Sequence, residues 1–596
     1  STYFACGCAR EPSSPSLRQK LQALGVHAQI CPIEGYGWVF FTTPDYADVA
    51  HSEQMIWIKL GHVHDGERLL TAQDMIGREW LTPDGVQVEA IQGSAALIGL
   101  AKHEPLCFIH RNLLSVPDVY YWTDPVDEVL VATDNLRLMI DLLPEPRLNE
   151  EVLPQHFLYR AVYGGQTYVQ DVSELLVGEM LTWRGGTSDV ELRRDLRALR
   201  GEKPYKPVDL ETVSWFFEQL RTVVGFYLEG NACRSATMLS GGPDSSLLQV
   251  AINAQPDINR PYPSFSYVVD TPAFAFEVEY AQQSVRALGT DHTFVEIKPE
   301  AYPDWLIQCI EILGRPIPDD VRPCFLALAD HISSRKRIIS RLFHGHIADG
   351  LHGVQNSLEI VQGDRYRNWP VPLLKVLGIV LVPVSRSKSY GARKAAETLL
   401  ARRDVNSPSH SLNSVGLYTD WELAGRCFSS RAVREALATK RGLQERYVDS
   451  DAMVEKANIL DLVTDGIDPA SVVRQLGLYC GREYIFPYGD EAILEATLSF
   501  DPVDRYTYDH RVKPILKLAL ESQVLLGVTN KPKGWSGVGQ AELGRWMREG
   551  VLSDLVRGIE RPSFIERVDF EWKVEQPDWF TWNLLTLDLF RKHVLA

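Results

Sequence analysis

Apolar residues in the first third of the chain fall in short runs separated by turn-forming residues. Residues 38–41, 55–58, 106–109 and 129–132 are four such runs, and Gly, Pro, Asp and Asn recur between them. Short apolar runs bounded in this way are typical of strands, whereas helices show an apolar position every three or four residues over a longer span. The pattern predicts a β-rich, layered N-terminal part.

The pattern changes after a polar stretch. Residues 196–209 belong to a charged segment that contains Pro204 and Pro207, and we expect them to form a linker. This linker would divide the chain into an N-terminal domain over residues 1–195 and a C-terminal domain over residues 210–596.

Strand and helix patterns alternate at the start of the C-terminal domain. A helical pattern over residues 213–228 is followed by strand candidates at 236–239, 264–269 and 292–297, with helix candidates at about 245–254 and 276–288 between them. Repetition of strand and helix at such short intervals predicts a parallel sheet with helices on its faces. After about residue 407 the pattern is mainly helical.

The composition agrees with a folded protein of several domains. The 596 residues exceed one ordinary core and suggest about two to four domains. Hydrophobic residues make up 45% and charged residues 23%, which is ordinary for a soluble chain. The net charge of −17 argues against a large basic face for nucleic-acid phosphates and against an anionic membrane surface. We therefore expect no nucleic-acid partner.

The cysteines and the N-terminal sequence bear on the compartment. The nine cysteines are scattered and odd in number, so we expect reduced thiols in a cytoplasmic protein. No basic region followed by an apolar core opens the printed chain. The most apolar stretch, residues 373–384, is interrupted by Lys375 and Pro383 and is too short for a membrane span. We expect neither a signal peptide nor a membrane-spanning segment.

A glycine-rich heptad, Ser-Gly-Gly-Pro-Asp-Ser-Ser over residues 240–246, lies between a strand candidate and a helix candidate. Gly241 and Gly242 let the backbone turn sharply and approach a ligand, because neither carries a Cβ. Ser245 and Ser246 stand where the helix would start, so their hydroxyls can cap it or bind phosphate oxygens. The N–H groups of the first turn and the helix dipole favour an anion there. The context predicts a phosphate loop in place of a purely structural turn.

Asp244 would repel phosphate as a bare anion. A carboxylate at this place makes sense as a ligand of Mg²⁺, which proteins hold through one or two carboxylates together with phosphate oxygens. The chain has neither a Gly-x-x-x-x-Gly-Lys-Ser/Thr loop nor a dinucleotide Gly-x-Gly-x-x-Gly in the right context. We therefore expect cleavage between the α- and β-phosphates of ATP, not transfer of the γ-phosphate.

The heptad after a strand resembles the ATP loop of the asparagine synthetase family, which includes β-lactam synthetases and the cyclases that close lasso peptides. Further segments resemble the family's motifs in the same order, over roughly residues 210–545. These are Ser264-Phe-Ser-Tyr267 with Glu277 and Tyr280-Ala281, His344-Gly-His-Ile-Ala-Asp-Gly350, Phe486-Pro-Tyr-Gly-Asp490, Val512-Lys-Pro-Ile-Leu516 and Asn530-Lys-Pro-Lys-Gly534. The resemblance implies an α/β parallel-sheet synthetase domain of the PP-loop type with a helical C-terminal part.

The resemblance also implies which residues contact the ligands. Those that would bind ATP are Leu239, Ser240, Gly241, Gly242, Asp244, Ser245, Ser246, Ser266, Tyr267 and Gly345. Asp244 and Asp349 would hold Mg²⁺, which screens the repulsion between a substrate carboxylate and the α-phosphate. A lysine would stabilise the departing pyrophosphate, with Lys533 the first candidate and Lys531 the second. An amine would then attack the acyl-adenylate to give an amide and AMP.

The N-terminal part resembles the glutaminase domain of asparagine synthetases, an α+β layered fold of the N-terminal-nucleophile (Ntn) type. Gly99, residues 131–134 and residues 168–178 resemble its later strands. Glutaminases of this class use an N-terminal cysteine whose α-amine is the base. The printed chain begins at Ser1, and Cys6 would need removal of five residues to become terminal. We expect a degenerate domain without glutaminase activity, so that the attacking amine belongs to the substrate.

Two kinds of ring closure fit such an amine. β-Lactam synthetases pair a tyrosine with a glutamate to deprotonate the amine; here His346 stands at the tyrosine position, and Glu483 and Asp468 are acidic candidates that no motif anchors. Lasso cyclases share the degenerate N-terminal domain and have a Lys-Pro-(Leu/Ile)-Leu helix and a Lys-Gly loop, which here start at Lys513 and Lys533. We favour closure of a peptide macrolactam. His346 is the candidate base, because imidazole accepts protons near neutral pH.

Several other hypotheses stand beside this one. They are a β-lactam synthetase acting on a small amino acid, an asparagine synthetase-like amidotransferase, a tRNA-modifying PP-loop enzyme and a non-catalytic relative. The acidic balance argues against the tRNA enzyme, and the presence of Asp244, Asp349 and the lysine loop argues against a non-catalytic relative. A lasso cyclase, which serves antibiotic biosynthesis, implies a peptide substrate, a leader peptidase that frees the attacking amine, and a leader-binding protein.

Overall fold

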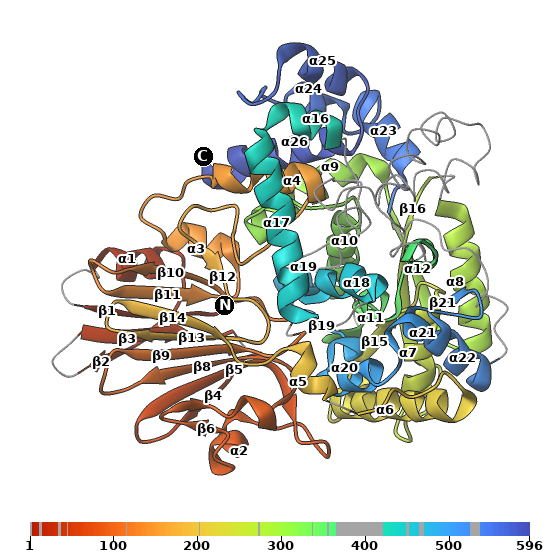
Figure 1. Cartoon of the computed structure of the whole chain (residues 1–596), viewed down its shortest axis with the longest axis horizontal. Coiled ribbons are helices and arrows are strands. Elements are labelled where there is room, and N and C mark those ends of the chain that lie inside the picture. The colour runs from red at the N-terminus through yellow and green to blue at the C-terminus, as the bar shows by residue number, and fades with distance from the viewer. Residues whose placement is uncertain are drawn as a thin grey trace, which may run out of the picture.

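The computed structural model describes the chain except for residues 1–2, 11–14, 34–36, 45, 115, 202, 272–273, 336–337, 355–356, 365–420, 449–451, 464–469 and 525–536. Two antiparallel sheets come first in the chain and a parallel sheet follows, and Figure 1 shows the two parts side by side. This arrangement confirms the expected order of a sheet-rich N-terminal part and a C-terminal part built on a parallel sheet with helices.

Two six-stranded sheets make up the N-terminal part. The first has the order β12-β10-β11-β1-β3-β2, with β1 Ala5–Arg10, β2 Gln29–Ile33, β3 Gly37–Thr42, β10 Tyr120–Asp124, β11 Val129–Thr133 and β12 Ser173–Glu174. The second has the order β14-β13-β9-β8-β5-β4, with β4 Asp48–His51, β5 Met55–His64, β8 Gln92–Ala101, β9 Leu106–Arg111, β13 Glu179–Arg184 and β14 Thr187–Leu192. The four apolar runs predicted to be strands lie in β3, β5, β9 and β11.

Side-chain alternation along the strands explains why these two sheets stack. Successive side chains of a strand face opposite sides of its sheet. In β1, Cys6 and Cys8 enter an apolar core shared with β5, β8 and β9 of the second sheet, whereas Ala5 and Ala9 face the other way. The outer faces are covered by α1 (Pro15–Ala23) and α3 (Leu136–Leu142) on the first sheet, and by α2 (Ala72–Gly77) with the hairpin of β6 (Leu81–Thr82) and β7 (Gly85–Val86) on the second.

The C-terminal part is built on a five-stranded sheet of order β17-β16-β15-β18-β19, in which every pair is parallel. Its strands are β15 Ser235–Met238, β16 Pro263–Val269, β17 Asp291–Ile297, β18 Arg341–Phe343 and β19 Glu483–Ile485. The chain moves outward from β15 to β17 and then crosses to the other side of β15. Such a reversal leaves a crevice at the carboxyl ends of the flanking strands, where open α/β sheets bind ligands. Here it lies between β15 and β18.

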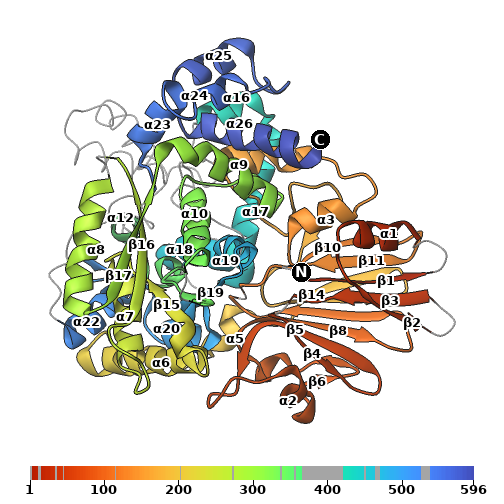
Figure 2. The ribbon, with the colours of Figure 1, turned by 180° about the vertical axis from the view of Figure 1, so that it is seen from behind.

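Helices cover both faces of this sheet (Figures 1 and 2). One face carries α6 (Leu210–Leu228), α7 (Pro243–Asn253), α8 (Ala275–Leu288) and α22 (Pro514–Gln523), and the other carries α9 (Tyr302–Leu313), α10 (Arg322–Ser333) and α19 (Ala470–Tyr479). The described residues from 421 onward are mainly helical, as expected. Their other helices are α16 Trp421–Cys427, α17 Ser430–Tyr447, α18 Met453–Val463, α20 Glu491–Leu498, α21 Pro502–Tyr506, α23 Gln540–Arg548, α24 Ser553–Arg557, α25 Arg567–Glu575 and α26 Trp579–Phe590.

The segment expected to be a linker carries structure of its own. It includes the short helix α5 (Leu196–Arg200), and Lys206 forms an isolated parallel bridge with Phe500. The two parts that it joins share an apolar core, because the largest cluster of buried residues extends from Ala5 in β1 to Phe590 in α26.

Candidate active site

The glycine-rich heptad forms the turn between β15 and α7, at the carboxyl edge of the parallel sheet. Gly241 has φ +84°, and a Cβ built there would lie 2.6 Å from the carbonyl oxygen of Tyr280 in α8. Only glycine fits this position without moving the backbone. Gly242 is the N-cap residue of α7 and Pro243 opens the helix. The N–H groups of the first turn of this eleven-residue helix therefore point out of the loop, which is the geometry that suits a phosphate.

The serines of the heptad hold the loop in shape. The Ser240 N–H donates to Ser245 Oγ (3.2 Å), and the two hydroxyl oxygens are 3.1 Å apart. Ser246 is fully buried, and its Oγ lies 3.4 Å from that of Ser284, which donates to the Gly241 carbonyl. Ser240 and Ser245 thus stay beside the helix N-terminus, whereas Ser246 is turned into the protein.

The neighbouring strand, β16, contacts the start of the loop through backbone and side-chain hydrogen bonds. The Leu239 N–H donates to the Phe265 carbonyl (2.9 Å), and Ser266 Oγ donates to the Leu239 carbonyl. The Tyr267 ring packs against Phe325 in α10. Ser266 and Tyr267, expected near the adenine, therefore lie in β16 next to the loop, with the Ser266 hydroxyl already bonded to backbone.

A second loop, residues 344–350, follows β18 and lies against the first. Gly345 makes this approach possible, since a Cβ there would lie 3.1 Å from the Ser245 nitrogen. Ile347 has φ +77°, a strained conformation for a β-branched residue. It precedes the short helix α11 (Ala348–His352), whose first turn carries Asp349. The two loops bring Asp244 and Asp349, from positions 105 residues apart in sequence, to one place.

Lys513 bridges the two aspartates. Its Nζ lies 2.6 Å from Asp244 Oδ2 and also contacts Asp349 Oδ1. The lysine is 5% exposed and sits, with φ +56°, directly before α22. Sequence reasoning quoted it within a motif but gave it no role. The sequence signal that could have identified Lys513 is its position directly before Pro514, the first residue of α22.

The two carboxylates fit the chemistry of Mg²⁺. Asp244 Oδ1 is buried and has no hydrogen-bond partner among the described residues. A hard oxygen donor without a partner, beside a second carboxylate and a helix N-terminus, matches the need of Mg²⁺ for one or two carboxylates, phosphate oxygens and waters. Among the residues that the structure describes, no group of three or more His, Cys, Asp or Glu forms a denser metal site.

His346 belongs to an aromatic cluster beside Asp349. The His346 N–H donates to His344 Nδ1 (2.9 Å), and the two rings are 4.2 Å apart, between Phe325 and Phe486. Burial, with the neighbouring charges of His346 and Arg322, lowers the pKa of His344 well below its ordinary value. A neutral His344 that accepts at Nδ1 holds the loop.

Glu483, the acidic candidate for closure of a β-lactam, is not brought to the loops. It starts β19, at the amino end of the parallel sheet, and its carboxylate contacts Arg341 (3.2 Å) and His62 of β5 (2.9 Å). Burial alone would raise the pKa of Glu483, but the charges of His62 and Arg341 lower it to about 2. An anion held in this way is a poor proton acceptor. Asp468, Lys531 and Lys533 lie outside the described residues.

Tyr488 contacts the heptad, and the sequence analysis gave this residue no role. It lies in the 3₁₀ turn Pro487–Gly489, within the motif that ends at Asp490, and its ring is fully buried. Its hydroxyl donates to the backbone carbonyl of Asp244 (3.0 Å).

The thiol of Cys6 lies inside the protein. Cys6 pairs with Phe41 and Ala132 in the middle of the first sheet, is fully buried and lies in the core between the two sheets. Burial, with the neighbouring Cys107, raises the pKa of Cys8 well above its ordinary value. Both thiols are buried, whereas a reactive cysteine is partly exposed.

The fold and the converging loops define a two-part protein whose candidate site lies at the switch point of a parallel α/β sheet. Residues 233–563 match asparagine synthase, and the chain belongs to this family. It is 23% identical over 267 residues to asparagine synthetase [glutamine-hydrolyzing] 1 of Bacillus subtilis (strain 168), a match that covers 45% of this chain and 40% of that protein.

A solved structure described as the allosteric regulatory enzyme of purine biosynthesis matches 50% of this chain and 80% of its own at 8% identity and a TM-score of 0.21. Similarity at that level does not define a shared fold. Among the helices of the described residues, none combines the length and the apolar character needed to cross a membrane.

Proposed function

We propose that this protein is an ATP-dependent, AMP-forming amide ligase that activates a substrate carboxylate as an acyl-adenylate. The observation that carries the proposal is the convergence of Asp244, Asp349 and Lys513 at the N-terminus of α7. Two carboxylates and one lysine, beside the N-terminus of α7, form a place for a polyphosphate and its counter-cation.

Each part of this arrangement has a role in the proposed reaction. The first turn of α7 binds phosphate oxygens, and the Ser240 and Ser245 hydroxyls stand beside them. Asp244 and Asp349 would hold Mg²⁺, which would screen the charge repulsion between the substrate carboxylate and the α-phosphate. Lys513 Nζ, which now neutralises both aspartates, donates to the departing pyrophosphate. The loop at residues 530–534, with Lys533 and Lys531, would supply further positive charge.

The N-terminal part supports the choice of nucleophile. Its two stacked antiparallel sheets with helices outside agree with a layered Ntn-type fold over residues 1–195, joined by residues 196–209 to a synthetase domain over residues 210–596. Because the Cys6 side chain is enclosed between the sheets, we propose that this domain releases no ammonia from glutamine. The amine then comes from the substrate itself.

Closure of a peptide macrolactam, as in lasso peptide cyclases, is the form of the reaction that we favour. Its base would be His346, which lies in the loop that carries Asp349. The substrate would be a peptide freed by a leader peptidase and delivered by a leader-binding protein. A β-lactam synthetase remains second, because Glu483 is held by Arg341 and His62 and cannot assist His346 from there. A glutamine- or ammonia-dependent amidotransferase is third.

The test is incubation of the purified protein with ATP, Mg²⁺ and candidate precursor peptides, followed by mass spectrometry and nucleotide analysis. We expect the peptide to lose the mass of one water and AMP and pyrophosphate to appear together. ADP in place of AMP would contradict the proposal. Product that needs glutamine or ammonia would support the amidotransferase, and stimulation by tRNA would support the nucleic-acid enzyme.

A further inference from the structure

The turn Pro487–Gly489 touches both loops of the candidate site. Tyr488 bonds the Asp244 carbonyl of the first loop, as described above. Gly489 faces the second loop, because a Cβ built on it would lie 2.5 Å from Ile347 Cδ1. On another side the same position lies 3.6 Å from the Leu114 carbonyl of the N-terminal part. This short segment is therefore placed between the site and the N-terminal sheets.

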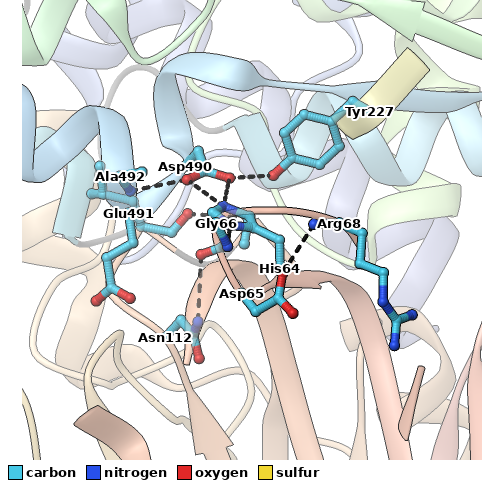
Figure 3. Close-up of polar contacts among 12 residues, drawn as sticks. His64, Asp65, Gly66, Arg68, Asn112, Tyr227, Asp490, Glu491 and Ala492 are labelled. Atoms are coloured by element: carbon cyan, nitrogen blue, oxygen red, sulfur yellow. Dashed lines mark hydrogen bonds and ion pairs between the residues drawn. The ribbon is translucent and has the colours of Figure 1, made fainter. Parts of the chain in front are cut away.

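Asp490 fixes the end of the turn. Its side chain is fully buried and accepts from Tyr227 in α6 (2.8 Å) and from the Ala492 N–H, where it caps α20 (2.9 Å). His64 of the N-terminal part places Nε2 3.0 Å from both of its carboxylate oxygens. Figure 3 shows these contacts meeting on Asp490. A buried carboxylate with three such partners has one position, because moving it would leave charge unpaired in the interior.

His64 is itself held rigidly. It ends β5, which pairs with β8 along its whole length from Met55 to His64. The Gly66 N–H donates to His64 Nδ1 (3.2 Å), so Nε2 carries the proton that points at Asp490. The Phe226 ring packs 4.8 Å from the imidazole. The histidine thus presents a fixed donor from the second N-terminal sheet to the C-terminal part.

We infer that His64 is a positioning residue for the nucleotide loop: through Asp490 it holds Tyr488 against Asp244 and Gly489 against Ile347. The N-terminal sheets then act as the support on which the phosphate site is set. This inference rests on the proposed nucleotide site, and it concerns residues that support the two loops of that site.

Isothermal titration of the full chain with Mg²⁺ and α,β-methylene ATP, which resists cleavage at the bond concerned, tests the inference. His64→Asn keeps an acceptor for Gly66 but removes the donor to Asp490, whereas His64→Gln keeps a donor where Nε2 lies. Tyr488→Phe removes only the hydroxyl. The matched control is His110→Gln, since His110 is an equally buried histidine of β9 whose Nδ1 contacts only the Glu179 carbonyl among the hydrogen bonds described.

We expect His64→Asn and Tyr488→Phe each to weaken binding about 2- to 10-fold, the size of one lost hydrogen bond. His64→Gln should restore affinity, and His110→Gln should leave it within about 2-fold. The His64→Asn, Tyr488→Phe double variant should lose less than the product of the single effects, because both act through one segment. Amides of residues 240–246 should exchange hydrogen faster in His64→Asn than in His110→Gln.

A folded His64→Asn protein with unchanged affinity and unchanged exchange in the loop would overturn the inference. If that variant does not fold, Asp490→Asn replaces it, because asparagine Oδ1 can still accept from the Ala492 N–H and cap α20, whereas the amide that stands in place of Oδ2 no longer accepts from His64 or Tyr227. If the wild-type protein binds no nucleotide, the proposed function fails. The exchange comparison then decides the positioning role by itself.

Discussion

Lys513 stabilises the close approach of Asp244 and Asp349, because its positive charge offsets their repulsion. Its side chain is buried and contacts the partly exposed Asp244 and Asp349, and without it the metal-free protein would hold two like charges side by side. Removal of one member of such a group leaves uncompensated charge. The lysine and a divalent cation are therefore alternative ways to neutralise the same two carboxylates.

We expect Lys513→Gln to lower the free energy of unfolding of the metal-free protein by about 1–3 kcal/mol, because the aspartates are partly exposed and water screens them. Millimolar Mg²⁺ should recover most of this loss, as measured by urea unfolding with and without the metal. Lys573→Gln is the control: Lys573 is 5% exposed and pairs with Asp578, far from the site in sequence. An equal recovery in both variants would contradict the shared site.

Asp244→Ala should abolish ATP–pyrophosphate exchange, and Asp349→Asn should reduce it at least about 100-fold, in keeping with the loss of a metal ligand or a transition-state donor. Asp330→Asn, an exposed change in α10, serves as control. Exchange at the wild-type rate in Asp244→Ala would remove this residue from the metal site.

The residue types of the heptad and of the second loop could be read from the sequence because their chemistry is local. Gly241, Asp244 and Asp349 were predicted from short motifs, and the structure brings them together. Tyr488 and Lys513 were missed because their contacts join segments 244 and 269 positions apart. Glu483 was a candidate only by its charge, and the structure places it against Arg341 and His62.

At the scale of elements, the first residue of α20, Glu491, has its carboxyl group buried, which disfavours the charged form. Glu491 is 2% exposed, and its Oε1 has no hydrogen-bond partner among the described residues. Burial raises the pKa of Glu491 to about 8; Arg194 opposes the rise, and Asp490 and Glu495 add to it. The folded protein therefore binds this proton more tightly than the unfolded chain does.

Stability should consequently fall as pH rises from the ordinary value of 4.5 toward about 8, by at most about 1.4 kcal/mol per pH unit from this group. Glu491→Gln removes the titration, so its advantage over the wild type should grow between pH 6 and about pH 8 and then level off. Urea midpoints at several pH values measure this. A constant difference across that range would show that Glu491 is ionised throughout.

The position of Cys6 in β1 gives a separate expectation. Cys6→Ala should leave amide formation unchanged within about 2-fold and should lower stability by about 1 kcal/mol, because only a small buried group is lost. Product yield with peptide substrate and the thermal midpoint report the two effects. Loss of activity with glutamine, but not with ammonia, would restore a glutaminase role to this thiol.

Strands and helices with clear periods were predictable, and their order in space was not. The runs at 38–41 and 55–58 are in β3 and β5, and the alternation after residue 210 gives β15, α7 and β16 in turn. The sequence did not reveal that β18 and β19 lie on the far side of β15, because 139 residues lie between these two strands. Strand pairing at that distance depends on tertiary packing, not on local pattern.

At the scale of the molecule, the two parts are joined by more than a linker. Hydrogen bonds cross between them at His62 with Glu483, His64 with Asp490 and Arg194 with Glu491. Residues 210–596 expressed alone should be largely insoluble, and co-expression with residues 1–209 should recover soluble protein, as judged by size exclusion. A soluble, cooperatively unfolding fragment 210–596 would show that the shared core is dispensable.

The apolar core that extends from β1 to α26 bears on how the N-terminal part is retained in evolution. If residues 1–195 have lost their own chemistry, their deletion would still expose apolar surface that is now buried on the rest of the chain. An N-terminal domain without catalytic activity would then be retained in evolution because the C-terminal domain needs its apolar surface to fold.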